Sequence, residues 1–186
     1  MSKPNYSGTY HMAEQANMDG YLAALDINFA LRKIVCLLRP TKEITHDPAT
    51  GAMSIRTLTT FKNFNMDFTI GKEFTEDLGP VDGRTCQTTV DWEGDKLICV
   101  QRGEKEGRGW THWLEGDKLH LVRVCVERKE EERKRSKQRG REGGGGRGKI
   151  KAGVENDAEI DMLNEEGHAN TGRAIHYMRS RKETLK

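Results

Sequence analysis

His112 lies between Trp110 and Trp113 in an alternating segment, and its imidazole could do one of three kinds of chemistry. Such a ring can be an acid–base catalyst, a metal ligand, or a single polar contact inside an apolar pocket. Catalysis would need an oriented carboxylic acid or nucleophile beside the ring. The nearest glutamates in sequence belong to predicted turns, where side chains are mostly solvated: Glu104, Glu106 and Glu115. We therefore predict no catalytic residue and no enzymatic activity.

A metal role for the imidazole would require further ligands at suitable spacings. Three other histidines show neither a His-x-His nor a His-Glu-x-x-His pattern: His11, His46 and His120. The four cysteines show no Cys-x-x-Cys or Cys/His pattern: Cys36, Cys86, Cys99 and Cys125. We predict no metal site and no cofactor. Because the N-terminal residues lack the apolar run of an export signal, we expect reduced thiols in a cytoplasmic protein.

Composition divides the chain near residue 126. Hydrophobic residues make up 34% of the chain and charged residues 32%, but apolar spacing is regular only up to about Val126. From Glu127 onward charge and glycine dominate, and such a segment buries too little apolar surface to offset the entropy of ordering. We predict one globular domain, residues 1–126, followed by a charged, glycine-rich, disordered tail, residues 127–186.

The charge of the chain argues against a nucleic-acid partner. A net charge of +2 is too small to indicate a DNA-binding protein. The Arg/Lys run of the tail could attract RNA or an anionic membrane. However, Tyr177 is the one aromatic residue there, so bases would find no stacking platform. We favour a solvated tail without RNA or membrane contact.

Two short helices are predicted before residue 40. The stretches that begin at Asn17 and Asn28 each place apolar residues at i, i+3, i+4 and i+7, which is the stripe of an amphipathic helix. Both asparagines are candidate N-caps, and Pro40 ends the second helix. Because only a residue or two joins the helices, we expect a compact helix-turn-helix lid.

After Pro40 the period of the apolar pattern changes from 3.6 to 2. Short alternating runs follow one another with turn residues between most of them, which is typical of an antiparallel meander. With a first strand at residues 7–12, they are residues 42–46, 53–60, 65–70, 72–76, 85–92, 96–102, 109–115 and 118–126. We predict a mainly β protein, an up-and-down antiparallel β-barrel that closes to remove its edges.

Polar side chains occur on both faces of several predicted strands. Trp110 and His112, for example, share one face, while Thr111 and Trp113 share the other. An interior of mixed polarity is typical of a cavity that holds a ligand and some water, and a barrel of eight to ten strands is wide enough for one.

Four stretches of the sequence then carry a family resemblance. They are Gly-Thr-Tyr at residues 8–10 and the segments 30–44, 55–74 and 99–121. The sequence resembles the intracellular lipid-binding proteins, and among them the cellular retinol-binding proteins. The resemblance implies a lipocalin-like, ten-stranded barrel with a helical lid, one buried hydrophobic ligand and no catalysis.

The resemblance also gives His112 a role. Fatty-acid and retinoic-acid binders of the family place a buried arginine here, whereas retinol binders place a neutral glutamine or histidine. A neutral polar group can exchange one hydrogen bond with an alcohol and leaves no buried charge unpaired. All-trans-retinol or a related retinoid is the ligand that this implies, for transport and storage by a monomer, with retinoid-metabolising enzymes as candidate partners.

Further ligand contacts are implied by the same resemblance. Lys42 matches a lysine near the retinol hydroxyl, although it could also be a solvated lysine at a strand end. Met18 stands where the family usually has a lid phenylalanine. The others match the portal turn and the cavity wall: Phe61, Lys62, Phe64, Met66, Thr57 and Trp110.

The sequence departs from the family after Leu121. The family's tenth strand pairs with the first strand and closes the barrel, but no such strand is predicted in the tail. Parity also turns Arg123 inward, so we expect the ninth strand to fray there or the arginine to lie at the barrel mouth. A missing strand predicts weaker retinol binding and lower stability than in a complete barrel.

Two alternative functions remain open at this point. One is a general carrier of fatty acids or other lipids, against which the absence of the family's tenth-strand Arg-x-Tyr pair argues. The other is a truncated, poorly binding variant whose basic tail mediates interactions.

Overall fold

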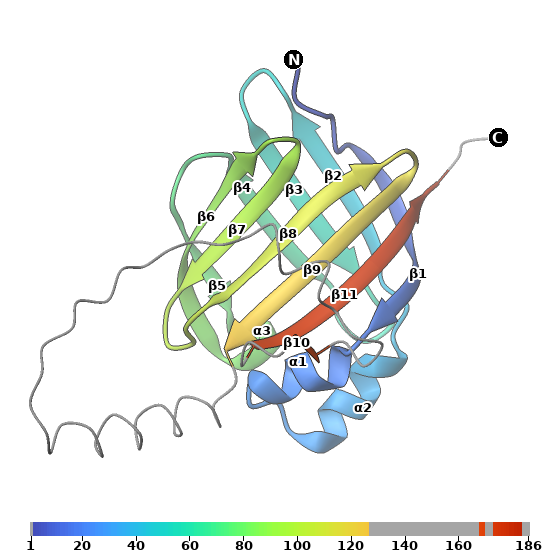
Figure 1. Cartoon of the computed structure of the whole chain (residues 1–186), viewed down its shortest axis with the longest axis vertical. Coiled ribbons are helices and arrows are strands. Elements are labelled where there is room, and N and C mark those ends of the chain that lie inside the picture. Colours follow the sequence, from blue (N-terminus) through green and yellow to red (C-terminus); the bar gives the residue numbers. More distant parts are fainter. Residues whose placement is uncertain (1, 127–167, 170–172, 184–186) are drawn as a thin grey trace, which may run out of the picture.

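The barrel is a single antiparallel sheet with helices at one end (Figure 1). The computed structural model describes residues 2–126, 168–169 and 173–183. The helices are α1 (Met18–Ala24), α2 (Phe29–Leu37) and the short α3 (Gly79–Asp82). The strands are β1 (Gly8–Ala16), β2 (Thr41–Asp47), β3 (Ala52–Leu58), β4 (Phe64–Thr69), β5 (Phe74–Leu78), β6 (Arg84–Glu93), β7 (Lys96–Arg102), β8 (Arg108–Glu115), β9 (Lys118–Val126), β10 (His168–Ala169) and β11 (Arg173–Lys182).

The strand order is β4-β3-β2-β1-β11-β9-β8-β7-β6-β5, with β10 paired to β11. All nine strands that the alternating pattern predicted are present. Each is the neighbour of the next, except that β4 and β5 lie at the two ends of the order, and β1 reaches β2 through the helices α1 and α2. Within the described residues the predicted up-and-down antiparallel β-barrel is therefore confirmed.

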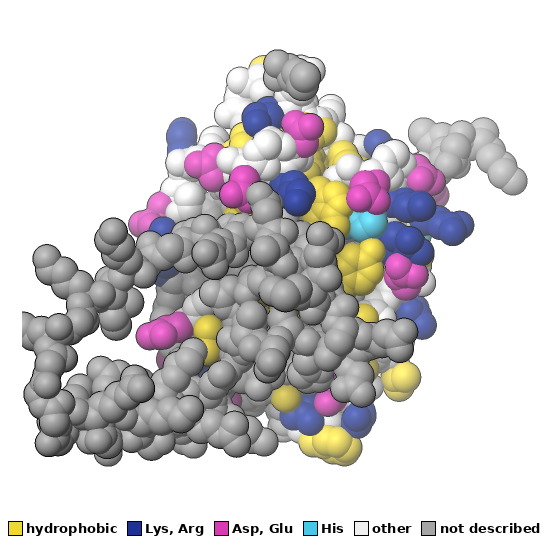
Figure 2. All heavy atoms as spheres, viewed as in Figure 1, with side chains coloured by type: hydrophobic (Ala, Val, Ile, Leu, Met, Phe, Trp, Pro, Cys, Tyr) yellow, Lys and Arg dark blue, Asp and Glu magenta, His cyan; other side chains and the backbone are white. Residues whose placement is uncertain are grey.

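The prediction that the closing strand is missing is wrong. β11 lies between β9 and β1 and pairs antiparallel with both, as the red strand in Figure 1 shows. The sequence hid it because basic residues such as Arg179 and Arg181 occur among its apolar ones. These arginines lie on the outward face, where basic side chains gather over β11 (Figure 2, right). The inward side chains are small, apolar or neutral: Ala174, His176, Met178 and Ser180.

The presence of β11 changes two earlier expectations. Residues 173–182 of the predicted tail belong to the sheet, whereas residues 127–167 lie outside the described residues. Because β11 pairs with both β1 and β9, there is no longer a reason to expect the weaker retinol binding and lower stability of an open barrel. The expected fraying at Arg123 is also wrong, because β9 continues to Val126 and Arg123 pairs with His176 across the β9–β11 ladder.

The helical lid packs against the closing strand. Asn28 caps α2 as predicted, since its side chain accepts a hydrogen bond from the Leu31 amide. Asn17 makes no such cap; it adopts a left-handed backbone with φ 57°. Its side-chain amide instead donates to the Ile175 carbonyl at 2.8 Å, which ties the start of α1 to β11.

The faces of the two helices differ in burial. α1 buries Tyr21 and Leu22 against β9 and β11, as its apolar stripe predicted. α2 buries no residue fully, and Phe29 and Leu37 are 63% and 81% exposed. Hydrophobic side chains accordingly reach the surface at the helical end (Figure 2, bottom). None of the helices in the described part of the chain has the length and apolarity needed to cross a membrane.

Candidate ligand-binding site

His112 points into the barrel from the middle of β8. Its ring is 2% exposed and lies 4.8 Å from the Trp110 ring, centroid to centroid. A Cβ at Gly109 would clash with the carbonyl oxygen of Cys99, so a glycine just before Trp110 allows β8 to lie this close to β7. The local sequence Gly-Trp-Thr-His thus brings an aromatic ring and an imidazole to the same inner face.

The hydrogen bonding of His112 determines which ring nitrogen carries the proton. Nδ1 lies 3.0 Å from the carbonyl oxygen of His120, and a carbonyl can only accept, so Nδ1 must donate. Burial lowers the pKa of His112 well below its ordinary value, and the nearby Lys42 lowers it further. The ring is therefore neutral at physiological pH, and its Nε2 carries a lone pair that can accept one hydrogen bond.

Lys42 lies inside the barrel on β2. It is 4% exposed, and its ammonium nitrogen lies 3.2 Å from the hydroxyl oxygen of Thr57 on β3. Burial, followed by the charge of Arg123, lowers the pKa of Lys42 to about 7. A solvated lysine at a strand end would show neither feature, so this alternative reading of Lys42 is wrong.

The remaining predicted contacts divide into inner and outer sets. Trp110 belongs to the main apolar cluster, with Met66 packed against it. Phe64 and Thr57 are half-buried and oppose each other on the inner face of β3 and β4. Three residues lie apart from this set: Phe61 and Lys62 are exposed in the β3–β4 turn, and Met18 packs against the cluster under α1.

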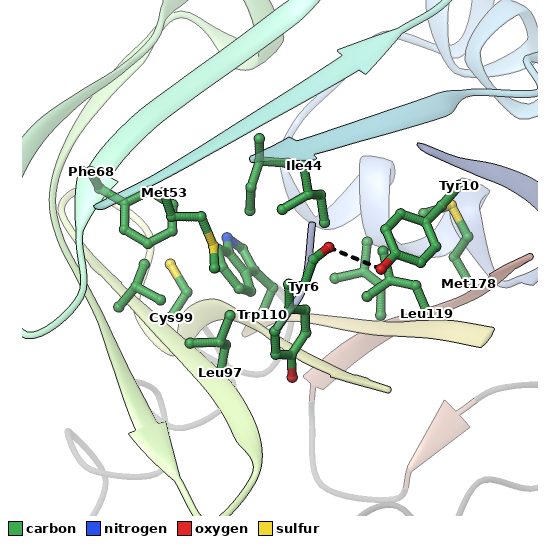
Figure 3. Packing of buried hydrophobic residues seen from close by; sticks show 13 residues of the cluster. Tyr6, Tyr10, Ile44, Met53, Phe68, Leu97, Cys99, Trp110, Leu119 and Met178 are labelled. Atoms are coloured by element: carbon green, nitrogen blue, oxygen red, sulfur yellow. Dashed lines mark hydrogen bonds between the residues drawn. The ribbon is translucent and has the colours of Figure 1, made fainter. Parts of the chain in front are cut away.

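The main apolar cluster fills much of the interior away from the lid (Figure 3). Within it the Tyr10 hydroxyl donates to the Tyr6 carbonyl at 2.9 Å, and the Tyr6 hydroxyl donates to the His112 carbonyl at 3.1 Å. These bonds link the N-terminal segment to the strand that carries His112. The cluster consists of Tyr6, Tyr10, Ile44, Met53, Ile55, Phe68, Val90, Leu97, Cys99, Trp110, Leu119, Leu121 and Met178.

A polar network faces the interior from β5, β6 and β7. The Glu76 carboxylate accepts hydrogen bonds from the Thr88 hydroxyl at 2.7 Å and from the Gln101 side-chain amide at 2.8 Å. Both donors are buried, so the carboxylate is well satisfied within the protein. The predicted mixture of apolar and polar residues in the interior is therefore present in the described residues.

Sequence reasoning missed a second polar group, which the closing strand brings to the lid end of the barrel. His176 is 0% exposed, and its Nδ1 lies 3.4 Å from the Arg123 guanidinium. Its Nε2 lies 3.3 Å from the side-chain oxygen of Gln15 on β1. The alternation of residues 174–180 was the available signal, but it was hidden by the charged composition of the tail.

Two open pockets are present on the described part of the chain. The larger, of about 580 Å³, reaches Met53, Phe68 and Phe74, on the strands beside the unpaired ends of the sheet. The smaller, of about 430 Å³, lies by Trp113 and Leu114 near the β6–β7 turn. The described residues contain no group of three or more His, Cys, Asp or Glu side chains that could hold a metal ion.

Comparison with known proteins gives concordant matches. The family model described as "Lipocalin / cytosolic fatty-acid binding protein family" matches residues 7–133. Retinol-binding protein 1 of Rattus norvegicus is 59% identical over 117 residues, covering 63% of this chain and 85% of the relative. Retinol-binding protein 5 of Pongo abelii is 53% identical over 118 residues, covering 63% of this chain and 86% of the relative.

One solved structure gives a similar match. The structure titled "Human cRBP IV" superposes with a TM-score of 0.69 at 31% sequence identity. The match covers 97% of this chain and 99% of that one.

Proposed function

The chain belongs to the lipocalin / cytosolic fatty-acid binding protein family, and we propose that it carries all-trans-retinol or a related retinoid inside the barrel. The relatives named retinol-binding protein 1 and 5 support this ligand class. The role is that of a cytoplasmic, monomeric, non-enzymatic carrier for transport and storage, with retinoid-metabolising enzymes as candidate partners.

One observation carries the proposal: His112 is buried, neutral and committed to a single tautomer. Since Nδ1 donates to the His120 carbonyl, Nε2 is left to accept a hydrogen bond from the hydroxyl of an alcohol. Retinol brings one such hydroxyl and no charge, so its binding leaves no buried ion unpaired. We propose that Lys42, which is also buried inside the barrel, donates to the oxygen of the same hydroxyl.

Apolar burial supplies most of the expected affinity. The polyene and ring of a retinoid would lie along the apolar cluster around Trp110, gaining roughly 25 cal/mol per Å² of apolar area removed from water. Thr57, Phe64 and Met66 are proposed wall contacts because they face the same interior. Phe61, Lys62 and Met18 are proposed as contacts on the family resemblance alone.

The decisive experiment is a retinol titration monitored by bound-retinol fluorescence. His112→Leu should weaken retinol binding about tenfold, since it removes the acceptor for a buried hydroxyl. His112→Gln should retain most of the affinity. Retinyl methyl ether, which has no O–H to donate, should bind equally to His112→Leu and to the unchanged chain.

The matched control is His11→Leu, because His11 is an exposed histidine on β1. This variant should leave retinol affinity unchanged. If the unchanged chain fails to bind retinol, the carrier proposal is wrong. If His112→Leu binds retinol as well as the unchanged chain, the role assigned to the imidazole is wrong.

A carrier of fatty acids is the second candidate, and one feature favours it. The inner face of β9 carries a half-buried guanidinium, that of Arg123, which a lipid carboxylate could pair. The variant with an interacting basic tail rested on a missing strand, and the tail residues 127–167 lie outside the described residues.

A further inference from the structure

The turn between α1 and α2 is held to the barrel by charged side chains. Asp26 lies in this turn with a left-handed backbone, φ 63°. Its carboxylate lies 2.9 Å from the guanidinium of Arg84 at the start of β6 and 3.1 Å from the ammonium of Lys105 in the β7–β8 turn. The Arg84 guanidinium also donates to the Leu25 carbonyl at 2.9 Å. Two cations of the barrel therefore bind one carboxylate of the lid.

The charges continue from Arg84 into the wall of the barrel. Its guanidinium lies 3.1 Å from the carboxylate of Asp82 in α3, which is at the lid end of the barrel (Figure 1), and 3.1 Å from that of Glu104. The Asp82 side chain is 0% exposed and also pairs with Arg108 at 2.9 Å. Three cations and three carboxylates thus form one group, which we call the lid network: Asp26, Asp82, Glu104, Arg84, Lys105 and Arg108.

Asp26 is the one member of the lid network that belongs to the lid. A buried charge is costly when its partner is removed, but most of this network stays paired without Asp26. Arg84 keeps two carboxylates, and Asp82 keeps two guanidinium groups. Movement of the turn away from the barrel therefore breaks the pairs of Asp26 and leaves the buried part of the network intact.

The two helices on either side of this turn are held to the barrel in different ways. α1 packs through Tyr21 and Leu22 in an apolar cluster that also contains Cys125 of β9. α2 buries no residue fully. Near its far end, the Gln15 side chain of β1 donates a neutral hydrogen bond to the Cys36 carbonyl at 3.1 Å. The ion pairs at the turn are therefore the charged attachment of a helix that has little apolar attachment of its own.

We propose that the lid network is an electrostatic latch: the pairs of Asp26 must break before the lid moves off the barrel, and this step limits how fast a ligand enters and leaves. The proposal rests on the proposed function in that the ligand lies inside the barrel. Lid movements of this kind set the rates of many binding proteins and enzymes. Because the latch is closed in the empty and the loaded chain alike, it slows association and dissociation by the same factor and leaves the affinity nearly unchanged.

The first test measures retinol association and dissociation by stopped-flow fluorescence, with the full chain and with Asp26→Asn. Asparagine tolerates the left-handed backbone and removes only the charge. Both rates should rise about tenfold, the effect of losing hydrogen bonds between charged groups, while Kd changes less than threefold. Since salt screens separated charges, 1 M NaCl should speed release from the unchanged chain and have much less effect on Asp26→Asn.

The second test needs no ligand, because Cys125 reports on the lid. This thiol is 0% exposed and lies in the apolar cluster under α1, whereas Cys99 is 3% exposed and lies in the main apolar cluster. Alkylation by iodoacetamide, followed at each cysteine by peptide mass spectrometry, should be about tenfold faster at Cys125 in Asp26→Asn. Alkylation of Cys99 should be unchanged, since opening of the lid does not unfold the barrel.

Two further variants complete the design. Glu43→Gln removes an exposed ion pair with Arg56 between β2 and β3, outside the lid, and should change neither the retinol rates nor the alkylation of Cys125. Arg84→Lys keeps the charge but loses the planar fork that reaches several partners at once. It should speed both measurements by less than Asp26→Asn does, and it serves if the asparagine variant does not fold.

The proposal is overturned if Asp26→Asn leaves the retinol rates or the alkylation of Cys125 unchanged. It is also overturned if Kd rises as much as the dissociation rate, as loss of a ligand contact would cause, or if Cys99 reacts faster by the same factor as Cys125, as general destabilisation would cause. A chain that does not bind retinol would contradict the proposed function, and the alkylation of Cys125 would still show whether Asp26 holds the lid closed.

Discussion

Strand β9 has two neighbours that reach it in different ways. β8 is joined to β9 by a tight turn at Gly116 and Asp117, whereas β11 follows after residues 127–172. Yet β11 pairs with β9 along nearly its full length, from Lys118 to Val126. Backbone groups at the edges of β1 and β9 need partners, and a matching strand satisfies them wherever it lies in the chain.

The two neighbours also divide the polar chemistry of the interior. β8 supplies His112, whose proton is held by a hydrogen bond to the adjacent strand. β11 supplies His176, whose proton is held by Gln15 on the strand at its other side. Pairing with a strand joined by a tight turn thus positions His112, and pairing with a strand from far along the chain completes the surroundings of Arg123.

Of the changes that test the comparison of β8 with β11, ending the chain after Gly172 should lower the stability most, because it removes β11. Without β11, two strand edges lose their partners and Arg123 loses its hydrogen bond to His176, which should cost about 5 kcal/mol or more, as much as a small domain's whole stability. The measurements are a thermal melt by circular dichroism and a retinol titration.

Deleting residues 128–150 is the matched control for that truncation. β9 and β11 meet at Val126 and Arg173, so a shorter connection need not span any distance. Halving a connection changes its closure entropy by only about 0.6 kcal/mol. A truncated chain that melts like the full chain would show that β11 is dispensable.

Cavity-forming substitutions in the two strands should show whether β11 is as well integrated as β9. Met178 on β11 is 2% exposed and Leu119 on β9 is 1% exposed, and both belong to the main apolar cluster. Met178→Ala and Leu119→Ala should each lower the free energy of unfolding by about 2–5 kcal/mol. Urea denaturation measures both. A cost below about 1 kcal/mol for Met178→Ala alone would mark β11 as loosely held.

Lowering the pH should separate the contributions of the two inward histidines. Folding lowers the pKa of both His112 and His176, so below the unfolded pKa of about 6.5 the unfolded chain binds more protons. Stability is therefore full above that pH and falls by about 1.4 kcal/mol per pH unit for each histidine as the pH drops.

The measurement is urea denaturation at pH 7, 6 and 5. His112→Gln and His176→Gln should each reduce the pH dependence of the free energy of unfolding between pH 6 and 5 by about 1.4 kcal/mol per pH unit. Over this range Lys42, with a pKa of about 7, is largely protonated in both states and adds little. An unchanged slope in either variant would contradict the burial of that ring as a neutral group.

Much of the fold could be predicted because its signals are local. Alternation in residues 109–115 was enough to put Trp110 and His112 on one face, and apolar spacing was enough to predict α1. The family resemblance singled out Lys42 as an inner residue, and the structure places it there. The polar partners of these residues, such as Thr57 for Lys42, come from other strands and could not be read from spacing.

The sequence by itself determined the nine strands up to Val126, their inner and outer faces, the lid and the inward imidazole at His112. Tertiary structure alone decided that residues 173–182 close the barrel and that β9 continues past Arg123, which meets His176, instead of fraying there. The physical reason is the distance along the chain over which each signal acts. The face of a strand follows from the alternation of its own residues, whereas strand pairing depends on which distant backbone groups still lack a partner.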